Sequence, residues 1–502
     1  MKHGFFNLSA WILAVMLLAS PFLFAAQAQM KEDIVPFAGP PKEWTTYQSS
    51  IRFSTDEKHL AYVCRKEKKF AVIFDGKMSA AYDGISQDSP FLSPDGAHVA
   101  YRVVKGDKWY VVRDGKEEAA YQAGSSLFFS PDSKNLAYIA QKNKLEFAMV
   151  VDGKEKPGYS GVVKDSVLFS PDSARLGYVV YKDKKLILVI DGKLSPQYDE
   201  LSHFIFSPDS KRYAYMAKLE NKWLMFVDGK EEASSEMMGG YSFSPDSRRL
   251  AYSLVEDGKW RMVIDGKKGP AYDRVSNATF SSDSRRTVYG VMKGKLSSMV
   301  VDGNNERSFE EIKYLTFSPD SKHCVYSARD GKKQFMVVDG KVGEPYDTVY
   351  IPVFSADSQH LGFRAQKGER WLVVMDGKEG KAYDNVISPV FSPDDKHIAY
   401  FAQKGGVWVV VRDGKEEGSV YAQLASPVWS PDSAHLACLA GVSGLGGAGD
   451  TWRVLVDGQK AKTVFSGFLG LPPLIFDDPK HIRSLAQRLP GPEFVRYNLT
   501  LP

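Results

Sequence analysis

A five-residue motif, Phe-Ser-Pro-Asp-Ser or a near copy of it, returns along almost the whole chain. Successive copies are separated by 37 to 40 residues, and an Asp-Gly pair follows each serine at 21 or 22 residues in ten copies and at 27 in the eleventh. Such a period is typical of repeat architectures, in which each unit buries its apolar faces against its neighbours. The serines are Ser54, Ser93, Ser130, Ser170, Ser207, Ser244, Ser281, Ser318, Ser355, Ser392 and Ser430.

Each repeat predicts four short strands, as residues 389–414 illustrate. Apolar residues before the serine form the first strand, and the Ser-Pro-Asp-Ser segment has the chemistry of a turn. Residues 397–401 and 408–412 form the second and third strands, and the third ends in Asp413-Gly414. Asp-Gly favours a tight hairpin because both central residues need a positive φ. A segment ending in Tyr383-Asp384 in the preceding repeat illustrates the fourth strand.

The second strand indicates how the repeats pack. Leu60 and Tyr62 lie on one face of the first copy and Ala61 on the other, and Leu136, Ala137 and Tyr138 repeat the pattern. Both faces are apolar, one large and one small, as expected of a strand buried on both sides. Four-stranded sheets stacked radially in this way form a β-propeller. The chain is therefore predicted to be all-β.

About twelve blades are predicted, because a degenerate twelfth repeat extends from Leu474 to Leu499. A single propeller has four to eight blades as a rule, so two tandem six-bladed rings are preferred, with residues 29–276 and 277–502 as the two domains. Rings of seven and five blades, or one large ring, remain open, since the spacing reveals no linker. The segment 44–50 is expected to supply the strand that the last repeat lacks and so to pair the two chain ends.

The N-terminus predicts a signal peptide over residues 1–28. Lys2 precedes an apolar stretch from Trp11 to Phe24, and Ala26-Gln27-Ala28 resembles a cleavage site. The apolar stretch is too short for a membrane-spanning helix. We therefore expect cleavage near Ala28, a periplasmic or secreted mature chain, and no membrane insertion after cleavage.

Charge and cysteine content exclude several classes. The formal net charge is +4, and lysines alternate with aspartates throughout, so nucleic acid is not an expected partner. Cys64, Cys324 and Cys438 all fall on the large-residue face of second strands, which predicts buried core positions. No metal, cofactor or cofactor-binding residue is predicted, and the chain is expected to be a monomer.

The repeat, as in residues 243–252 (Phe-Ser-Pro-Asp-Ser-Arg-Arg-Leu-Ala-Tyr), resembles the WD-related propeller repeat of TolB-type proteins and of prolyl-oligopeptidase propeller domains. The resemblance covers residues 44–465. It implies an envelope-side binding module. The repeats begin without the α/β domain that precedes the TolB propeller, and the Gly-x-Ser-x-Gly motif of the peptidases does not occur.

Two residue types recur at fixed positions. A histidine stands five residues after six of the serines, as in His59 and His397, and is expected at the surface where the turn ends. A tryptophan stands sixteen residues after five of them, as in Trp223 and Trp371. Packing between blades explains these tryptophans better than an aromatic ligand platform, because the repetition serves the ring itself.

The end of the blades opposite the Ser-Pro-Asp-Ser and Asp-Gly turns varies from repeat to repeat and carries both charge signs. We interpret it as a possible partner-binding rim; the alternative is a set of solvated loops whose salt bridges contribute little. The rim consists of Lys66, Lys68, Lys69, Asp83, Lys184, Lys185, Asp199, Asp273, Lys332, Lys333, Asp347 and Asp384.

The leading hypothesis is an exported, non-catalytic scaffold that binds a protein, or a cell-wall glycan, through this face. No catalytic residue is predicted. The alternative is a hydrolase or lyase acting on a polysaccharide or peptide in the central channel. His203 and the pair Glu310-Glu311 depart from the repeat pattern and are the positions at which such chemistry would be sought.

Overall fold

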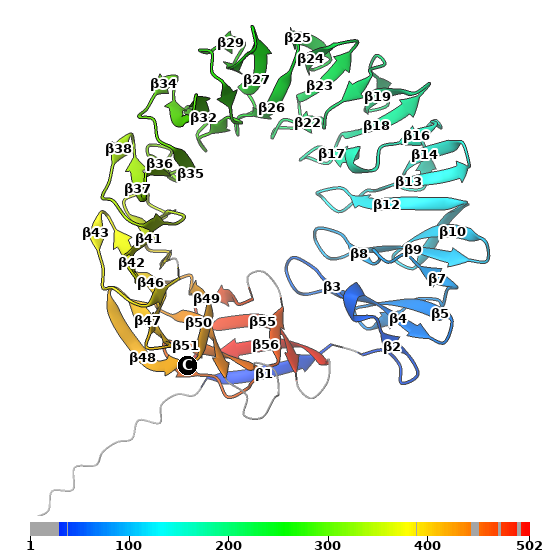
Figure 1. The fold of residues 1–502 in the computed structure, drawn as a ribbon. Helices are drawn as coiled ribbons and strands as arrows, with labels where there is room; N and C mark the ends of the chain where they lie inside the picture. The colour runs from blue at the N-terminus through cyan, green and yellow to red at the C-terminus, as the bar shows by residue number, and fades with distance from the viewer. Residues whose placement is uncertain (1–29, 38, 388, 443–450, 470–472, 489–492) are drawn as a thin grey trace, which may run out of the picture.

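Twelve small antiparallel sheets follow one another around a single ring (Figure 1). The computed structural model describes residues 30–37, 39–387, 389–442, 451–469, 473–488 and 493–502, so the predicted signal peptide lies outside the described residues. The all-β propeller of twelve blades is confirmed. The ring corresponds to the third arrangement considered above, and the preferred pair of six-bladed rings is not formed. Residue 276, the predicted boundary, lies inside the seventh blade, between two pieces of its innermost strand, Arg274–Val275 and Thr279–Phe280.

Each blade has four strand positions, ordered from the inside of the ring outward. We number the blades 1 to 11 after Ser54 to Ser430 and call the twelfth sheet the closing blade. The second strands are β4 (Leu60–Lys66), β9 (Val99–Lys105), β13 (Leu136–Asn143), β18 (Leu176–Lys182), β23 (Tyr213–Leu219), β27 (Leu250–Glu256), β32 (Thr287–Lys293), β36 (Cys324–Asp330), β41 (Leu361–Lys367), β46 (Ile398–Lys404) and β50 (Leu436–Val442).

The third strands pair with the second strands through short hairpins. They are β5 (Lys69–Phe74), β10 (Lys108–Arg113), β14 (Glu146–Val151), β19 (Lys185–Ile190), β24 (Lys222–Val227), β28 (Lys259–Ile264), β33 (Leu296–Val301), β37 (Lys333–Val338), β42 (Arg370–Met375), β47 (Val407–Arg412) and β51 (Thr451–Val456).

The outermost, fourth strands follow the Asp-Gly turns and are mostly two residues long. They are β6 (Lys77–Met78), β11 (Lys116–Tyr121), β15 (Lys154–Glu155), β20 (Lys193–Leu194), β25 (Lys230–Ser235), β29 (Lys267–Lys268), β34 (Asn304–Asn305), β38 (Lys341–Val342), β43 (Lys378–Glu379), β48 (Lys415–Tyr421) and β52 (Gln459–Lys460).

The innermost, first strands are broken into two short pieces in seven of these blades, and two of the breaks hold single-turn helices, η1 (Gln48–Ser50) and η2 (Lys164–Ser166). The pieces are β2 (Thr45–Thr46) and β3 (Arg52–Phe53), β7 (Gly84–Ile85) and β8 (Phe91–Leu92), β16 (Gly161–Val162) and β17 (Leu168–Phe169), β21 (Glu200–Leu201) and β22 (Ile205–Phe206), β30 (Arg274–Val275) and β31 (Thr279–Phe280), β39 (Thr348–Val349) and β40 (Val353–Phe354), and β44 (Asn385–Val386) and β45 (Val390–Phe391). The unbroken ones are β12 (Ala123–Phe129), β26 (Met238–Phe243), β35 (Glu311–Phe317) and β49 (Gln423–Trp429).

The core consists of a series of clusters, most of them lying between two neighbouring blades. Between blades 1 and 2, Ala61 and Val63 of the small face pack with Val99, Tyr101 and Val103 of the large face, and all five are buried. Each side chain of this size contributes about 1.5–3 kcal/mol when fully buried. The expected packing of a large face on a small one is confirmed.

The three cysteines lie in these clusters as predicted. Cys64, Cys324 and Cys438 are buried and unpaired. Burial raises the pKa of Cys64 to about 11 and that of the other two thiols to about 12. The thiols therefore remain protonated and serve as small apolar side chains.

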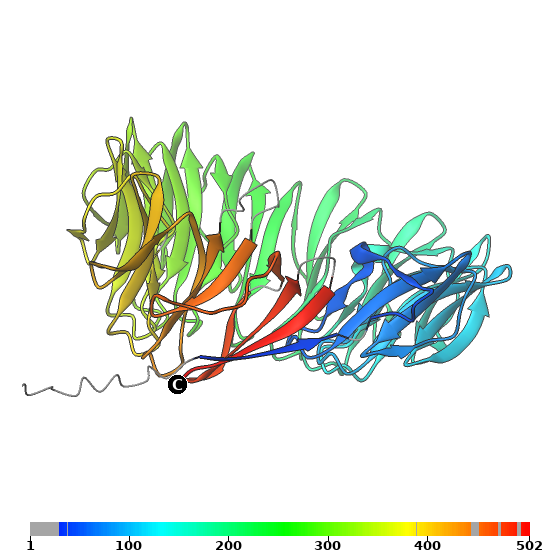
Figure 2. The same cartoon turned by 90° about the horizontal axis from the view of Figure 1, so that it is seen from below.

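The closing blade joins the two ends of the chain. Its first strand is broken into β53 (Gly467–Leu469) and β54 (Ile475–Asp478), its second is β55 (His481–Arg488) and its third is β56 (Glu493–Thr500). The fourth strand comes from the other end of the chain: β1 (Lys31–Pro36) pairs antiparallel with β56. Figure 2 shows β1 in blue beside the red strands of this blade. Pairing of the chain ends is confirmed, but segment 44–50 was the wrong segment. It belongs to blade 1, where β2 pairs with β4, because β4 leaves that edge of its own sheet free.

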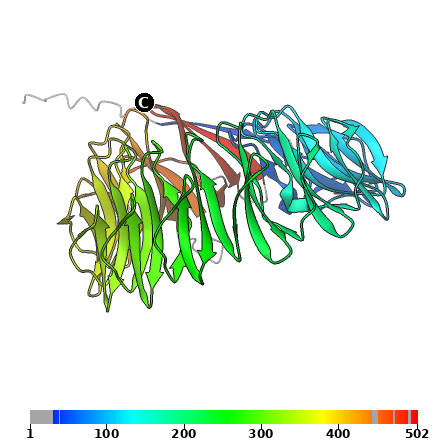
Figure 3. The same ribbon diagram turned by 90° about the horizontal axis from the view of Figure 1, so that it is seen from above.

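Edge-on views show the blades standing side by side, with their strands running from one face of the ring to the other (Figures 2 and 3). Every blade therefore presents one end to each face. We call the end with the Ser-Pro-Asp-Ser and Asp-Gly turns the turn face. We call the end with the hairpins between second and third strands, and with the connections between blades, the loop face.

Candidate functional site

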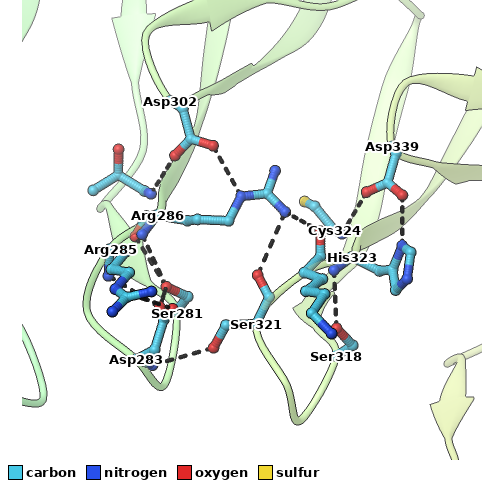
Figure 4. Close-up of polar contacts among 12 residues, drawn as sticks. Ser281, Asp283, Arg285, Arg286, Asp302, Ser318, Ser321, His323, Cys324 and Asp339 are labelled. Carbon is cyan, nitrogen blue, oxygen red and sulfur yellow. Dashed lines mark hydrogen bonds and ion pairs between the residues drawn. The ribbon is translucent and has the colours of Figure 1, made fainter. Parts of the chain in front are cut away.

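On the turn face, a similar polar network is built in ten of the eleven repeats, and blade 3 has Asn135 in place of the arginine or histidine. In blade 7 the Asp302 carboxylate accepts hydrogen bonds from Thr287 N at 2.8 Å and from Arg286 Nε at 2.9 Å (Figure 4). In blade 8 Asp339 accepts one from Cys324 N at 2.9 Å and contacts His323 Nδ1 at 2.7 Å. Each aspartate has a positive φ and so forms the hairpin that Asp-Gly predicts.

The network also links neighbouring blades. The Asp283 backbone N–H of blade 7 donates to Ser321 Oγ of blade 8 at 3.1 Å, and the Arg286 guanidinium reaches the carbonyl oxygens of Ser321 and Lys322 (Figure 4). The recurring histidines occupy the place of this arginine. They are partly exposed, as predicted. Each also contacts the Asp-Gly aspartate of its own blade, which was not predicted.

On the loop face, the five aspartates of the predicted rim each join two blades. Asp83 accepts hydrogen bonds from Lys69 Nζ at 2.6 Å and from Gly106 N of the next blade at 2.9 Å. Asp347 accepts them from Lys333 Nζ and Gly368 N, both at 2.7 Å. The same pairs of bonds form at Asp199 with Lys185 and Glu220, at Asp273 with Lys259 and Gly294, and at Asp384 with Arg370 and Gly405.

These contacts lower the pKa of four rim carboxylates, those of Asp83, Asp199, Asp273 and Asp347. The hydrogen bond from Lys69 and then the one from Gly106 N hold the pKa of Asp83 below its usual range. Lys333 has the same effect on the pKa of Asp347. The hydrogen-bonding capacity of these aspartates is thus directed largely at their own ring.

The seven rim lysines divide into two groups. Lys69, Lys185 and Lys333 pair with the rim aspartates, and Lys66 pairs with Glu43. Lys68, Lys184 and Lys332, at the tips of the hairpins of blades 1, 4 and 8, are exposed and form no ion pair with any described residue. These three ammonium groups are the members of the rim that remain available to a partner.

Four of the six recurring tryptophans pack between blades, as predicted. Trp223, Trp371, Trp408 and Trp452 lie against the clusters shared with the following blade. Blade 7 has Ser297 at the equivalent position, identified by its bridge to Phe309. A cavity of about 400 Å³ opens beside it, between blades 7 and 8.

The cavity lies toward the loop face. Its walls come from β30, β32 and β33 of blade 7 and from β35 of blade 8, and Arg274, the residue after rim aspartate Asp273, is among them. Ile312, Tyr314 and Leu315 form the wall on blade 8. Tyr314 is 36% exposed and has a φ of 56°, which is rare for a residue with a bulky side chain.

An aromatic stack continues from this wall to blade 9. The Tyr314 and Tyr350 rings are stacked with centroids 6.4 Å apart, and the Arg364 guanidinium lies 3.7 Å from the Tyr350 centroid and 5.2 Å from that of Trp371. Cation–π contacts of this kind hold a ring in one orientation. Blades 7 to 9 therefore carry a cavity and a fixed aromatic surface on the inner strands.

No protein-family model and no curated protein sequence matches this chain. Among solved structures, TolB from Acinetobacter baumannii is 16% identical, with a TM-score of 0.23 over 52% of this chain and 80% of that chain. The propeller domain of the Trilobed protease from Pyrococcus furiosus is 16% identical, with a TM-score of 0.26 over 52% of this chain and 97% of that one.

A eukaryotic initiation factor structure is 12% identical, with a TM-score of 0.34 over 74% of this chain and 96% of that chain. TolB, which the repeat was expected to resemble, and a protease propeller domain are thus among the solved structures similar to this chain, and the likeness concerns the fold alone.

The two positions that the repeat singled out for chemistry have structural partners. Glu310 and Glu311 both pair with Arg329, and Lys313 also contacts Glu311 at 2.8 Å. The hydrogen bonds from Lys313 and Arg329 lower the pKa of Glu311, whereas a general acid needs a raised one. His203 accepts a hydrogen bond from the Tyr241 hydroxyl through its carbonyl oxygen.

The described residues contain no group of three or more His, Cys, Asp or Glu side chains placed to hold a metal ion. In the same part of the chain, no helix has the length and apolar character needed to cross a membrane.

The sequence interpretation missed the cavity. The sequence does indicate it, because Ser297 stands where six other repeats have tryptophan.

Proposed function

We propose that the protein is an exported, non-catalytic propeller scaffold that binds another protein through its loop face. The observation that carries the proposal is the difference between the two faces. On the turn face the Ser, Asp and Arg or His side chains are used in one repeated network. The loop face has cations available at Lys68, Lys184 and Lys332.

The loop face also exposes large apolar side chains on its hairpins. Leu145 is 82% exposed in the hairpin of blade 3, and Leu219 and Leu296 are 45% and 46% exposed at the hairpins of blades 5 and 7. Apolar anchors surrounded by a polar rim are typical of protein–protein interfaces. This combination supports a protein partner over a purely polar ligand.

Export is part of the proposal because of the predicted signal peptide. A non-catalytic role is supported by the ion pairs that Glu310 and Glu311 form with Arg329, because these two residues are the most conspicuous acid pair outside the repeat pattern. A cell-wall glycan is the competing ligand, and the test below distinguishes it.

The test is crosslinking and affinity capture of the tagged mature chain from its own cell envelope. A variant with Lys68, Lys184 and Lys332 changed to Glu reverses charge on the loop face. The matched control changes Lys58, Lys134 and Lys396 to Glu on the turn face, where each ammonium group pairs with the aspartate of its own turn.

We expect the wild-type chain and the control to capture the same protein and the loop-face variant to lose it, with unchanged thermal unfolding in all three. Equal capture by the loop-face variant would contradict the proposal. Retention of the chain on purified peptidoglycan, with no protein captured, would assign the face to a glycan instead.

A further inference from the structure

Blade 7 lacks a side chain that the ring uses almost everywhere else. The position concerned is the second residue of the third strand, where that strand pairs with the end of the fourth-strand segment. It holds a large apolar residue in nine of the eleven repeats: Phe70, Trp109, Phe147, Leu186, Trp223, Trp260, Trp371, Trp408 and Trp452. In blade 8 the position is Gln334, whose Oε1 accepts a hydrogen bond from Val349 N at 3.0 Å. In blade 7 it is Ser297.

A second loss lies beside the first. Gly290 stands on the adjoining strand, at a position where blades 4 and 5 have Val179 and Met216 and the neighbouring blades 6 and 8 have a serine. In β32 and β33, Gly290 pairs with Met299 and Ser297 with Met292, so both small residues open the same face of the sheet. The cavity of about 400 Å³ is the volume that these absent side chains leave against blade 8.

The lining suits an aromatic group. Met292, Met299 and Ile312 provide apolar walls, and the Tyr314 ring stands at the edge, held by its stacking on Tyr350. Methionine side chains adapt to irregular shapes and contact aromatic rings favourably. The volume falls within the range of about 300–1,000 Å³ that is typical of ligand pockets.

The mouth of the cavity is positively charged. Arg274 lines it, is exposed, and forms no ion pair with the residues that the structure describes. Lys293 and Lys295 do not line the cavity, but they are exposed in the adjoining hairpin and form no ion pair within the described part of the chain. Asp273 is engaged by Lys259 and by Gly294 N. An aromatic group with a carboxylate beside it therefore complements both the cavity and its entrance.

We propose that this cavity binds an aromatic side chain of the protein partner, of the kind that fills the equivalent place in other blades, while a neighbouring carboxylate of the partner pairs with Arg274. The inference rests on the proposed function, since it places the anchor of the partner at one point of the loop face. Buried aromatic anchors dominate the binding energy of many interfaces, so we expect this site to contribute much of the affinity for the partner.

The first experiment uses small probes on the full mature chain. N-acetyl-5-fluorotryptophan carries an indole beside a carboxylate, and its amide lacks the charge; ¹⁹F NMR line broadening reports the binding of each. We expect the carboxylate probe to bind with millimolar or better affinity. Ser297→Trp, which restores the side chain used in six other repeats, should weaken binding of both probes by about tenfold or more.

Two further variants separate the parts of the site. Gly290→Val fills the cavity from the other strand; its Cβ would meet Ser276 Oγ at an ordinary 3.4 Å, and both probes should again be lost. Arg274→Gln should weaken the carboxylate probe about fivefold or more and leave the amide unchanged. Leu186→Trp, at the equivalent position of blade 4, is the control and should bind both probes normally.

Wild-type chain that binds neither probe, or Ser297→Trp that binds them as well as wild type, would overturn the inference. Displacement of the probes by peptidoglycan fragments but not by aromatic peptides would assign the cavity to a glycan and also overturn it. Affinity capture distinguishes the two proposals: a Ser297→Trp chain that still captures the partner refutes the aromatic anchor, while a partner lost only on loop-face charge reversal leaves the scaffold function intact.

Discussion

The two faces of the ring use the same residue type for different purposes. On the turn face, Asp302 and its equivalents shape the hairpin and bind the start of the second strand of their own blade. On the loop face, Asp347 and its equivalents join their own third strand to the hairpin of the next blade. The turn face has nearly the same residues from blade to blade. The loop face varies in sequence, and only some of its blades are joined by an aspartate. A repeat protein can therefore fix its geometry at one face and vary the other without losing the ring.

The largest expected effect comes from removing a turn-face aspartate. Asp302→Ala places alanine at a φ of 51° and removes the bonds to Thr287 N and Arg286, so we expect the free energy of unfolding to fall by about 3 kcal/mol. Asp347→Ala on the loop face, where the backbone is unstrained, should cost clearly less. Chemical denaturation of both variants measures the difference. An equal loss of unfolding free energy in the two variants would mean that the loop-face aspartates stabilise the ring as much as the turn-face aspartates do.

A smaller effect is expected where the turn face departs from its own pattern. In most repeats a serine three residues after the first serine accepts the Asp N–H of the preceding blade, as Ser133 does from Asp95 at 3.0 Å. Blade 2 has Gly96 there, with a φ of 73°, and a Cβ would stand 2.4 Å from Ser54 Cβ. Gly96→Ser should therefore destabilise the chain by about 2 kcal/mol even though it restores the common residue.

The reciprocal change, Ser133→Gly, should cost about 1 kcal/mol through the lost hydrogen bond. Thermal unfolding of both variants makes the comparison. A stabilised Gly96→Ser chain would show that blades 1 and 2 approach less closely than the structure indicates.

The smallest effect concerns pH. The hydrogen bond to Asp376 raises the pKa of His360 above its ordinary value of 6.5. Because the folded state binds this proton more tightly, the contribution to stability is complete below the ordinary pKa and is lost as the pH rises through the raised one. His360→Arg, which copies Arg286 and its equivalents, should remove this dependence. Unfolding midpoints between pH 5.5 and 8.5 test it; an unchanged slope in the variant would assign the dependence to other groups.

Local features were predictable because their causes lie within one repeat. The position of the Asp-Gly hairpins, the large and small faces around Tyr62 and Ala61, and the burial of Cys324 follow from backbone chemistry and from alternation along a strand. The rim was predicted only in part. The charges of Asp83 and Lys69 were visible, but the bond from Gly106 N comes from the next blade, and nothing in a single repeat indicates it.

By itself, the sequence determined a ring of about a dozen repeated four-stranded blades, because period, turn residues and two-sided burial act over short distances. Only the tertiary structure decided that the blades form one ring, that Lys31–Pro36 closes it, and that Ser297 and Gly290 open a cavity against Tyr314. These outcomes depend on how small rotations between blades accumulate and on which sheet edge stays free. Such quantities are set by side-chain volumes across many interfaces, so no spacing within the chain expresses them.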